Sequence, residues 1–300
     1  MSSLVLPDLI IAGAPKSGST SLFRWLSDHP DVVGSLEKET YFLVDPGSHM
    51  HRPDRHVSRG LEGYANLFPT DANDGRVRVE ATPAYMVHET ARAAVQDMPS
   101  KPLVLFILRE PVAQIKSSYD YFRNNWHWIP PGMRFDEWVG TTSGPAAFRG
   151  NELAGDPMGT ANYVHHLRAW RDAVGAERMI VCLFEDMRTN PKAFMRSLAE
   201  RLGISPSHYD SYHFPIENES YAVRSHALQR VNIALRQRLP KGAVYNAIRT
   251  VYRAFNTTPA TRLGSEAAAR TLKERFAAEN AALAQEFDLD LSPWREANAS

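Results

Sequence analysis

The 300-residue sequence has one cysteine, no long hydrophobic run and no excess charge of either sign. Cys182 alone cannot form an internal disulfide, as expected in a reducing compartment. No stretch approaches the roughly 18 apolar residues of a membrane-spanning helix. No signal peptide is expected, because the glycine-containing loop after the first predicted strand begins at Gly13. Because the 34 basic and 34 acidic residues cancel, no nucleic-acid partner is expected. These absences predict a soluble, cytoplasmic protein whose anion sites are local clusters.

Short apolar runs alternate with helical patterns along the chain. Strands are predicted at 8–13, 77–81, 103–108 and 178–184. Helices are predicted at 19–28, 88–97, 111–124, 159–173, 191–202, 224–239 and 266–287, and long loops at 43–63 and 125–160. Strands separated by helices favour a parallel sheet covered on both faces. We therefore predict an α/β protein of the P-loop type, with three α/β/α layers around a central parallel sheet and a single domain over 1–300.

The segment after the first predicted strand has the composition of a phosphate-binding loop. Gly13 and Gly18 have the glycine spacing of the triphosphatase loop G-x-x-x-x-G-K-[ST], and a predicted helix follows. Backbone N–H groups and the dipole at a helix N-terminus favour an anion. Ser19 stands where the motif has lysine, and Lys16 lies upstream instead. An ordinary strand-to-helix turn is the alternative interpretation.

The predicted strand 103–108 ends in a cation. A magnesium-dependent triphosphatase needs an acidic metal ligand at a second strand end, whereas Arg109 stands there. Arg109 and Ser117, two helical turns further on, can together bind a phosphate through charge and a hydroxyl donor. A surface salt bridge and a solvated serine are the alternative. We therefore expect phosphate binding without a metal site.

Two further segments contribute to the pattern. Residues Glu37–Phe42 contain carboxylates shortly after the predicted helix 19–28, and one of them is a candidate general base. A solvated charge cluster is the alternative interpretation. Residues Val79–Tyr85 are typical of a strand end followed by a turn, and by themselves they indicate little.

Together, the four segments resemble the sulfotransferase family, whose members use 3′-phosphoadenosine 5′-phosphosulfate (PAPS). Pro15–Leu22 match its loop P-K-[SG]-G-[ST]-[ST]-[ST]-L. Leu108–Tyr119 match its 3′-phosphate motif L-R-x-P-x-x-R-x-x-S-x-Y, except that Gln114 replaces an arginine. Lys38–Phe42 resembles, in a near variant, the K-E-x-x-[FY]-F element of the heparan-type branch and its bacterial relatives. Weaker matches lie at Gly159–Trp170, Phe184–Pro191 and Leu289–Trp294.

The resemblance implies sulfuryl transfer from PAPS to a hydroxyl of a carbohydrate or another small-molecule or lipid acceptor, with 3′-phosphoadenosine 5′-phosphate (PAP) as product. It implies that Glu39 is the general base and that Lys16 stabilises the leaving group. It further implies that Arg109 and Ser117 bind the 3′-phosphate, and that no metal takes part. The residues implied to bind the 5′-phosphate are Lys16, Ser17, Gly18, Ser19, Thr20 and Ser21.

Several alternatives stay open at this stage. Ala81 stands where heparan-type enzymes often have a lysine, so either another cation replaces it or the acceptor is handled differently. A histidine is the alternative base, with His88, His127 and His165 as candidates. Arg224 either closes over the nucleotide or is a surface residue.

Two other functions compete with sulfuryl transfer. A P-loop kinase of a small molecule needs a metal ligand and a lysine at position 19, and an inactive nucleotide-binding scaffold needs neither Lys16 nor Glu39. For the acceptor, the aromatic segment Tyr121–Pro131 can stack on sugars or pack on lipids, phenols or the protein core. Basic side chains between His49 and Arg59 either recognise an anionic acceptor or form a solvated loop. The sequence does not predict the acceptor, the sulfated position or the oligomeric state.

Overall fold

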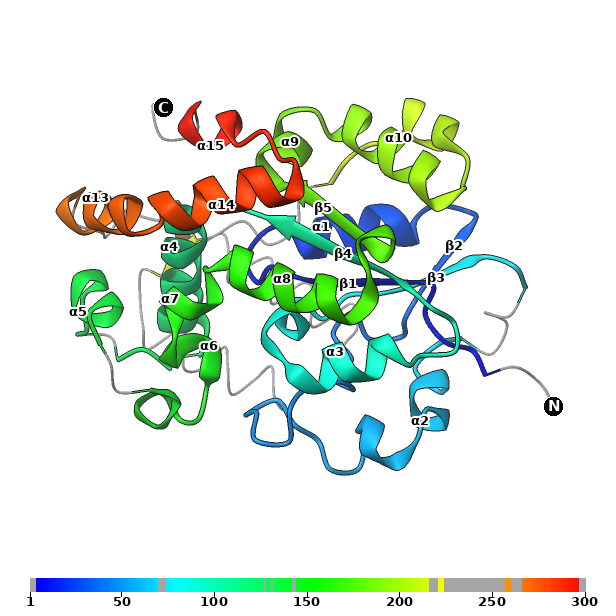
Figure 1. Cartoon of the computed structure of the whole chain (residues 1–300), viewed down its shortest axis with the longest axis horizontal. Coiled ribbons are helices and arrows are strands. Elements are labelled where there is room, and N and C mark those ends of the chain that lie inside the picture. The colour runs from blue at the N-terminus through cyan, green and yellow to red at the C-terminus, as the bar shows by residue number, and fades with distance from the viewer. Residues whose placement is uncertain are drawn as a thin grey trace.

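The computed structural model describes residues 4–69, 74–126, 128–130, 132–141, 144–215, 221–223, 257–259 and 266–296. The predicted helix 224–239, Arg224 and His127 lie outside the described residues. Within these ranges the centre of the fold is a five-stranded parallel sheet in the order β2-β3-β1-β4-β5 (Figure 1). Its strands are β1 (Leu9–Gly13), β2 (Val32–Gly34), β3 (Val77–Glu80), β4 (Leu103–Leu108) and β5 (Met179–Leu183). All four predicted strands are confirmed, whereas the three-residue β2 was not predicted.

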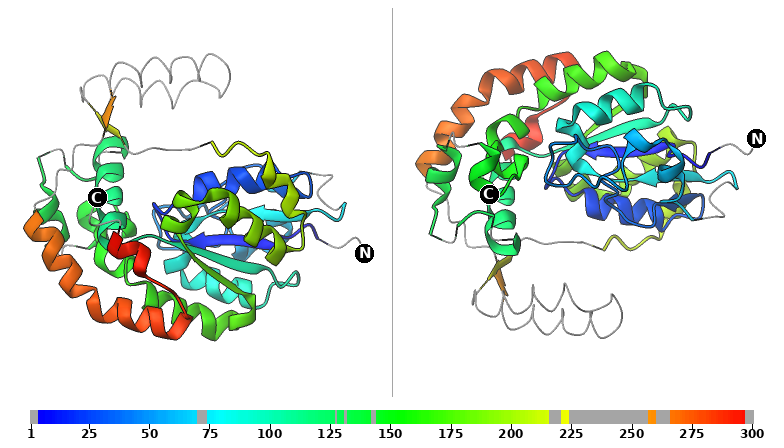
Figure 2. Two further views of the ribbon diagram at one scale, coloured as in Figure 1. Left: turned by 90° about the horizontal axis from the view of Figure 1, so that it is seen from above. Right: turned by 90° about the horizontal axis from the view of Figure 1, so that it is seen from below.

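Helices cover both faces of the sheet, as Figure 2 shows with the strands between two helical layers. Leu9 and Ile11 of β1 pack in one core cluster with α1 (Ser19–Ser27) and α10 (Pro191–Leu202). The intervening residues of β1 point to the other face, where Ile10 packs with α3 (Glu89–Gln96), α8 (Tyr163–Val174) and α14 (Ala277–Phe287). Successive strand residues face opposite sides, so this alternation gives the sheet two apolar faces. The predicted three-layer α/β/α fold is therefore confirmed.

A third apolar cluster lies at one end of the sheet, built around α4 (Pro111–Tyr121) (Figure 2). Helix α4 continues as a π-helical segment over Phe122–Trp126, which replaces the end of the predicted helix 111–124. The predicted helix 266–287 is two helices, α13 (Glu266–Arg275) and α14, because Phe276 between them packs into this third cluster while Leu283 of α14 packs over the sheet.

The two predicted loops contain short helices, which corrects that prediction. Tertiary packing stabilises single turns that have too few residues for a sequence signal. In 43–63 and 125–160 these are η1 (Val57–Arg59), the start of α2 (Glu62–Ala65), α5 (Phe135–Val139), η4 (Pro145–Phe148), α6 (Glu152–Gly155) and α7 (Pro157–Thr160). Helix α7 is separate from α8, so the predicted helix 159–173 is likewise divided. The remaining elements are η2 (Pro83–Val87), η5 (Ala176–Arg178), α9 (Phe184–Thr189), η6 (Pro206–Asp210), β6 (Tyr221–Val223), β7 (Thr257–Pro259) and α15 (Ser292–Glu296).

The C-terminal ends of the strands position the candidate site. Strand β1 leads through a short loop into α1, and β4 leads directly into α4. The N–H of Ala14 donates to the carbonyl of Ile107 at 2.8 Å, which ties the two strand ends together. Ligands of open parallel sheets bind at this edge. No helix of the described ranges has the length and apolar character needed to span a membrane.

Candidate active site

The loop after β1 has a backbone that only a few residue types accept. Gly18 is the N-cap of α1 and has a left-handed φ of 88°. A Cβ at this position would lie 2.6 Å from Met187 and 2.8 Å from Phe184, so both conformation and space require glycine. Lys16 has φ 64°, and Tyr41 across the site has φ 53°. A left-handed non-glycine residue costs about 1–3 kcal/mol, and such residues concentrate at functional sites.

The residues predicted for the site lie on four segments. Lys16, Ser17 and Gly18 form the loop, and the three hydroxyl residues after them begin α1. Glu39 lies in the segment after β2, Arg109 follows β4, and Ser117 is buried on α4. The predicted residues on these segments are Lys16, Ser17, Gly18, Ser19, Thr20, Ser21, Glu39, Arg109 and Ser117.

The polar groups of the loop fit an anionic ligand. The Ser17 hydroxyl is fully buried and has no hydrogen-bond partner among the described residues. Such a group costs about 1–3 kcal/mol, and a phosphate oxygen would satisfy it. The Arg109 guanidinium donates to the carbonyl of Lys16 at 3.3 Å and lies over the Phe184 ring at 4.9 Å. Burial lowers the pKa of Arg109, so a bound anion would stabilise its charge.

Gln114, the departure from the family arginine, supports the loop. Its amide nitrogen donates to the carbonyl of Pro15 at 3.0 Å and to the hydroxyl of Ser118 at 3.2 Å. The amide oxygen is buried without a partner in the described structure. Gln114 therefore joins α4 to the loop by hydrogen bonds, where an arginine would also supply charge.

Glu39 is an ionised carboxylate with both oxygens engaged. The Lys38 ammonium lies 2.8 Å from Oε1, and the Tyr41 hydroxyl donates to Oε2. Burial raises the pKa of Glu39, but the ion pair and hydrogen bond with Lys38, the hydrogen bond from Tyr41 and the charge of Lys16 together bring that pKa below its usual value. Burial and the neighbouring Glu39 raise the pKa of Tyr41, which keeps its hydroxyl protonated as a donor.

Lys16 is electrostatically coupled to the same site. Burial lowers its pKa to about 8; the positive charges of Lys38 and Arg109 act in the same direction, and Glu39 opposes them. Its ammonium lies 3.8 Å from the ring centroid of Tyr121 at the end of α4, a cation–π contact. The structure thus brings Lys16 and Glu39 into one charged cluster.

Lys38 is a site residue that the sequence reasoning missed. Its ammonium contacts Glu39 and also lies 3.3 Å from the hydroxyl of Ser19 on α1, while its side chain is only 17% exposed. Its carbonyl accepts from the N–H of Ala81 at 3.1 Å. The signals were its place beside Glu39 and its match to the lysine of the K-E-x-x-[FY]-F element, and neither predicts a contact with α1.

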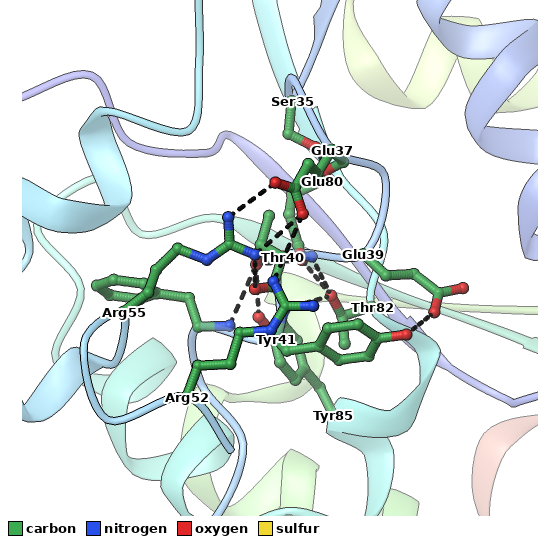
Figure 3. Close-up of polar contacts among 11 residues, drawn as sticks. Ser35, Glu37, Glu39, Thr40, Tyr41, Arg52, Arg55, Glu80, Thr82 and Tyr85 are labelled. Atoms are coloured by element: carbon green, nitrogen blue, oxygen red, sulfur yellow. Dashed lines mark hydrogen bonds and ion pairs between the residues drawn. The ribbon is translucent and has the colours of Figure 1, made fainter. Parts of the chain in front are cut away.

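Thr40, between Glu39 and Tyr41, is held by hydrogen bonds with the side chains of Thr82, Glu80, Tyr85 and Arg55 (Figure 3). The N–H of Thr40 donates to the Thr82 hydroxyl at 3.0 Å, and its hydroxyl donates to Glu80 at 2.9 Å. Its carbonyl accepts from Arg55 at 3.3 Å. These bonds fix the backbone from which the Glu39 side chain projects.

Glu80 lies beneath this segment and is fully buried. Burial raises its pKa to about 7, although hydrogen bonds from Thr82 and Thr40 favour the ionised form. Its second oxygen and the Tyr64 hydroxyl are both buried without hydrogen-bond partners among the described residues. The sequence pattern alone indicates no role for Glu80, since a carboxyl at a strand end is uninformative by itself.

The basic loop residues proposed for anion recognition are largely engaged within the protein. Arg55 makes a bidentate ion pair with Glu37 at 2.9 Å for both contacts. Nδ1 of His49 lies 2.6 Å from Oε2 of Glu152, and Nε2 of His56 lies 2.9 Å from the carbonyl oxygen of Val44. These three side chains stabilise the loop and are not displayed for a ligand.

The alternative histidine bases have other surroundings. His88 is buried and lies between Asp45, at 3.2 Å, and Glu152, at 3.5 Å. His165 is exposed on α8 and its ring contacts His166. Neither has Lys38 or Lys16 beside it as Glu39 does.

The two weaker motifs Phe184–Pro191 and Leu289–Trp294 contact each other and the turn after β4. The Glu185 carboxylate accepts from the N–H of Glu110 at 3.1 Å and from the indole N–H of Trp294 at 2.9 Å. Glu110 follows Arg109 and caps α4 by accepting from the N–H of Ala113. The C-terminal tryptophan therefore supports the turn that carries Arg109.

A parallel sheet with a glycine-containing loop, a helix N-terminus and partly buried cations at one edge is typical of α/β proteins of the P-loop type. Within the described residues, no group of three or more His, Cys, Asp or Glu side chains is arranged to hold a metal ion. Residues 6–231 match the family model described as the sulfotransferase domain. The chain belongs to the sulfotransferase domain family.

Known proteins of the family resemble this chain at modest identity. Human bifunctional heparan sulfate N-deacetylase/N-sulfotransferase 2 is 25% identical over 203 residues, covering 67% of this chain and 22% of that protein. Human heparan sulfate glucosamine 3-O-sulfotransferase 3B1 is 32% identical over 114 residues, covering 38% of this chain and 26% of that protein. The chain thus spans about a quarter of the length of these relatives.

One solved structure supports the fold over nearly the whole chain. A sulfotransferase from Alicyclobacillus acidocaldarius superimposes with a TM-score of 0.67 at 21% identity, covering 96% of this chain and 98% of that one. The likeness establishes a common fold.

Proposed function

We propose that this chain, acting as a single domain, transfers a sulfuryl group from PAPS to a hydroxyl-bearing acceptor. The observation that carries the proposal is the convergence of Lys16 and Glu39 beside a loop whose buried Ser17 hydroxyl lacks a partner in the described structure. Membership of the sulfotransferase domain family supports the same reaction. The partly buried cations and the unpaired hydroxyl fit a bound phosphosulfate.

Bound PAPS would supply the sulfuryl group, with PAP as product. The helix N-terminus and the hydroxyls of Ser17, Ser19, Thr20 and Ser21 would hold the 5′-phosphate, with Gly18 allowing close backbone approach. Arg109 and Ser117 would hold the 3′-phosphate, which distinguishes PAPS from ATP. Positioning of this kind supplies a large share of catalysis in transfer reactions.

The proposed chemistry is an in-line displacement at sulfur. Glu39 accepts the proton of the acceptor hydroxyl as its oxygen forms the new bond to sulfur. The bridging S–O bond breaks with its electron pair going to the phosphate oxygen, and Lys16 stabilises that growing charge. Glu39, whose pKa lies below its usual value, is ionised at neutral pH, and Lys16 is mainly protonated below about pH 8. Activity is therefore expected between these two pKa values.

A carbohydrate is the acceptor class that we propose. Relatives named as heparan sulfate sulfotransferases support it. Tyr121, whose ring contacts Lys16, begins a segment rich in aromatic residues. Trp126 in this segment is 44% exposed, and its ring stacks on that of Trp128 with the ring centroids 5.5 Å apart. Aromatic faces of this kind stack on sugar rings.

Ligand-dependent thermal stability tests the proposal and its rivals. PAP at about 100 times its Kd should stabilise the fold by about 2.7 kcal/mol, more than ATP or adenosine 5′-phosphate at the same concentration. Mass spectrometry of glycans, lipids and phenols incubated with PAPS should then find a product heavier by one sulfuryl group. Magnesium-dependent ATP turnover would support the kinase instead, and PAP binding without transfer to any acceptor would support the scaffold.

A further inference from the structure

We infer that Lys38 is a catalytic residue of the proposed transfer, a second cation that contacts the sulfuryl group from a position between the base and the phosphate-binding loop. This inference rests on the proposed function, because it assigns a role within the same reaction.

The position of the Lys38 ammonium carries the inference. It lies 2.8 Å from Oε1 of Glu39 and 3.3 Å from Oγ of Ser19, so it bridges the base and the first residue of α1. An acceptor oxygen held by Glu39 and a sulfuryl group held at the start of α1 would both lie beside it. An ammonium has three N–H donors, and these two contacts account for two of them in the described structure.

The backbone around Lys38 fixes this position. The Lys38 carbonyl accepts from Ala81 at 3.1 Å, and the N–H of Ser35 donates to the carbonyl of Val79 at 2.9 Å. The Ser35 hydroxyl donates to the carbonyl of Glu37 at 2.7 Å. The segment therefore lies along the end of β3, where Ala81 is fully buried and brings no charge. Lys38, hydrogen-bonded to Ala81, places a cation at this edge.

Three cations act on one another at the site. Lys38 and Arg109 are close enough to Lys16 to lower its pKa, while Glu39 and Asp120 act on that pKa in the opposite direction. Burying like charges together is unfavourable unless negative charge lies among them. These three cations are suited to stabilise the negative charge that develops on the sulfuryl oxygens and the leaving oxygen.

Lys38 moves no proton in the proposed step. The acceptor O–S bond forms while the bridging S–O bond breaks, the electron pair goes to the phosphate oxygen, and the acceptor proton goes to Glu39. Lys38 stays protonated throughout and donates a hydrogen bond to a sulfuryl oxygen as charge develops there.

The test compares Lys38→Met with Lys38→Arg, and uses Lys192→Met as a matched control. Lys192 lies on α10, is half exposed and shares its partner Asp210 with Arg196. Initial rates are measured from pH 4.5 to 9.5 with radiolabelled PAPS and an unsulfated glucuronate–glucosamine oligosaccharide. Release of PAP by transfer to water is followed in parallel, and melting temperatures establish that each variant folds; Lys38→Gln replaces the methionine variant if that one does not.

We expect Lys38→Met to lower kcat by about two to three powers of ten. Both limbs of its pH profile should move to higher pH, since Glu39 loses a positive partner and Lys16 loses a positive neighbour. The remaining charged and titratable groups facing these two residues stay in place: Tyr41 faces Glu39, and Arg109 and Asp120 face Lys16. Lys38→Arg should retain both limbs and most of kcat, and Lys192→Met should match the wild type.

Two results would overturn the inference while leaving the proposed function intact. One is a Lys38→Met variant whose kcat stays within about threefold of the wild type at its own optimum. This result rejects the catalytic role even if the limbs move, because Lys38 would then only adjust neighbouring pKa values. The other is an equal loss of kcat in Lys38→Arg and Lys38→Met with unmoved limbs, as expected of a packing role. A wild type that releases no PAP from PAPS would instead refute the proposed function, and the inference with it.

Discussion

Glu80 is a fully buried carboxyl group beneath the Glu39 segment, and replacing it by glutamine should change how stability depends on pH. Burial raises its pKa to about 7 in the folded protein, against 4.5 for an exposed glutamate. The folded state therefore holds this proton more tightly than the unfolded state does. The stability that this proton contributes is fully present below pH 4.5 and is lost as pH rises through 7.

The magnitude follows from the two pKa values. A difference of about 2.5 pKa units corresponds to at most about 3 kcal/mol, of which about 2.5 kcal/mol falls between pH 5 and pH 8. Glutamine has nearly the same shape, does not titrate, and its oxygen can accept from Thr40 and Thr82 as Glu80 does. The free energy of unfolding of Glu80→Gln should therefore rise by about 2.5 kcal/mol relative to that of the wild type between pH 5 and pH 8.

Urea unfolding of both proteins at pH 5, 6, 7 and 8 measures this difference. Other titrating groups contribute equally to the two proteins and cancel in the comparison. Glu89→Gln is a matched control, because it makes the same substitution at a side chain that is 87% exposed at the start of α3. If the wild-type and Glu80→Gln free energies of unfolding stay parallel over this range, Glu80 does not hold its proton more tightly in the folded state and the reasoning is wrong.

Three further predictions concern the proposed reaction. Lys16→Ala and Glu39→Gln should each lower turnover by about two to four powers of ten, while calorimetry finds PAP binding to Glu39→Gln nearly unchanged; near-normal turnover of that variant would remove Glu39 from the base role. Arg109→Ala should weaken binding of PAP far more than binding of adenosine 5′-phosphate in titration calorimetry, and equal losses would place the 3′-phosphate elsewhere. Tyr41→Phe removes a hydrogen bond to ionised Glu39, so the pKa of Glu39 should rise and the acid limb of the kcat profile should move to higher pH; an unmoved limb would show that this bond does not stabilise the carboxylate.

Most of the sheet and the loop could be predicted because their signals are local. The predicted strands 8–13, 103–108 and 178–184 contain continuous apolar runs, and 77–81 alternates apolar and charged residues. The glycine and hydroxyl spacing of Pro15–Leu22 depends on backbone geometry within a few residues. Strand β2 could not be predicted, because its three residues are too few to show a periodic pattern. The helices within 43–63 and 125–160 could not be predicted either, because single helical turns are stable only when the rest of the protein packs against them.

The predicted helix 266–287 shows a different limit. Its apolar positions have one helical period, and so the sequence indicates one uninterrupted helix. The residues before and after Phe276 pack into two separate clusters, one around α4 and the other over the sheet. Only the relative position of those clusters determines that the helix is divided.

By itself the sequence determined the parallel α/β fold, the position of the glycine- and hydroxyl-containing loop and the family resemblance, because each rests on residues close together in the chain. Only the tertiary structure decided that Lys38 bridges Glu39 and Ser19, that Glu80 lies buried under Thr40, and that His49, Arg55 and His56 are used internally. Apart from the contact between the adjacent Lys38 and Glu39, those contacts join residues that are separated in the sequence. Their charges, burial and pKa values depend on distances that exist only once the sheet has brought the segments together.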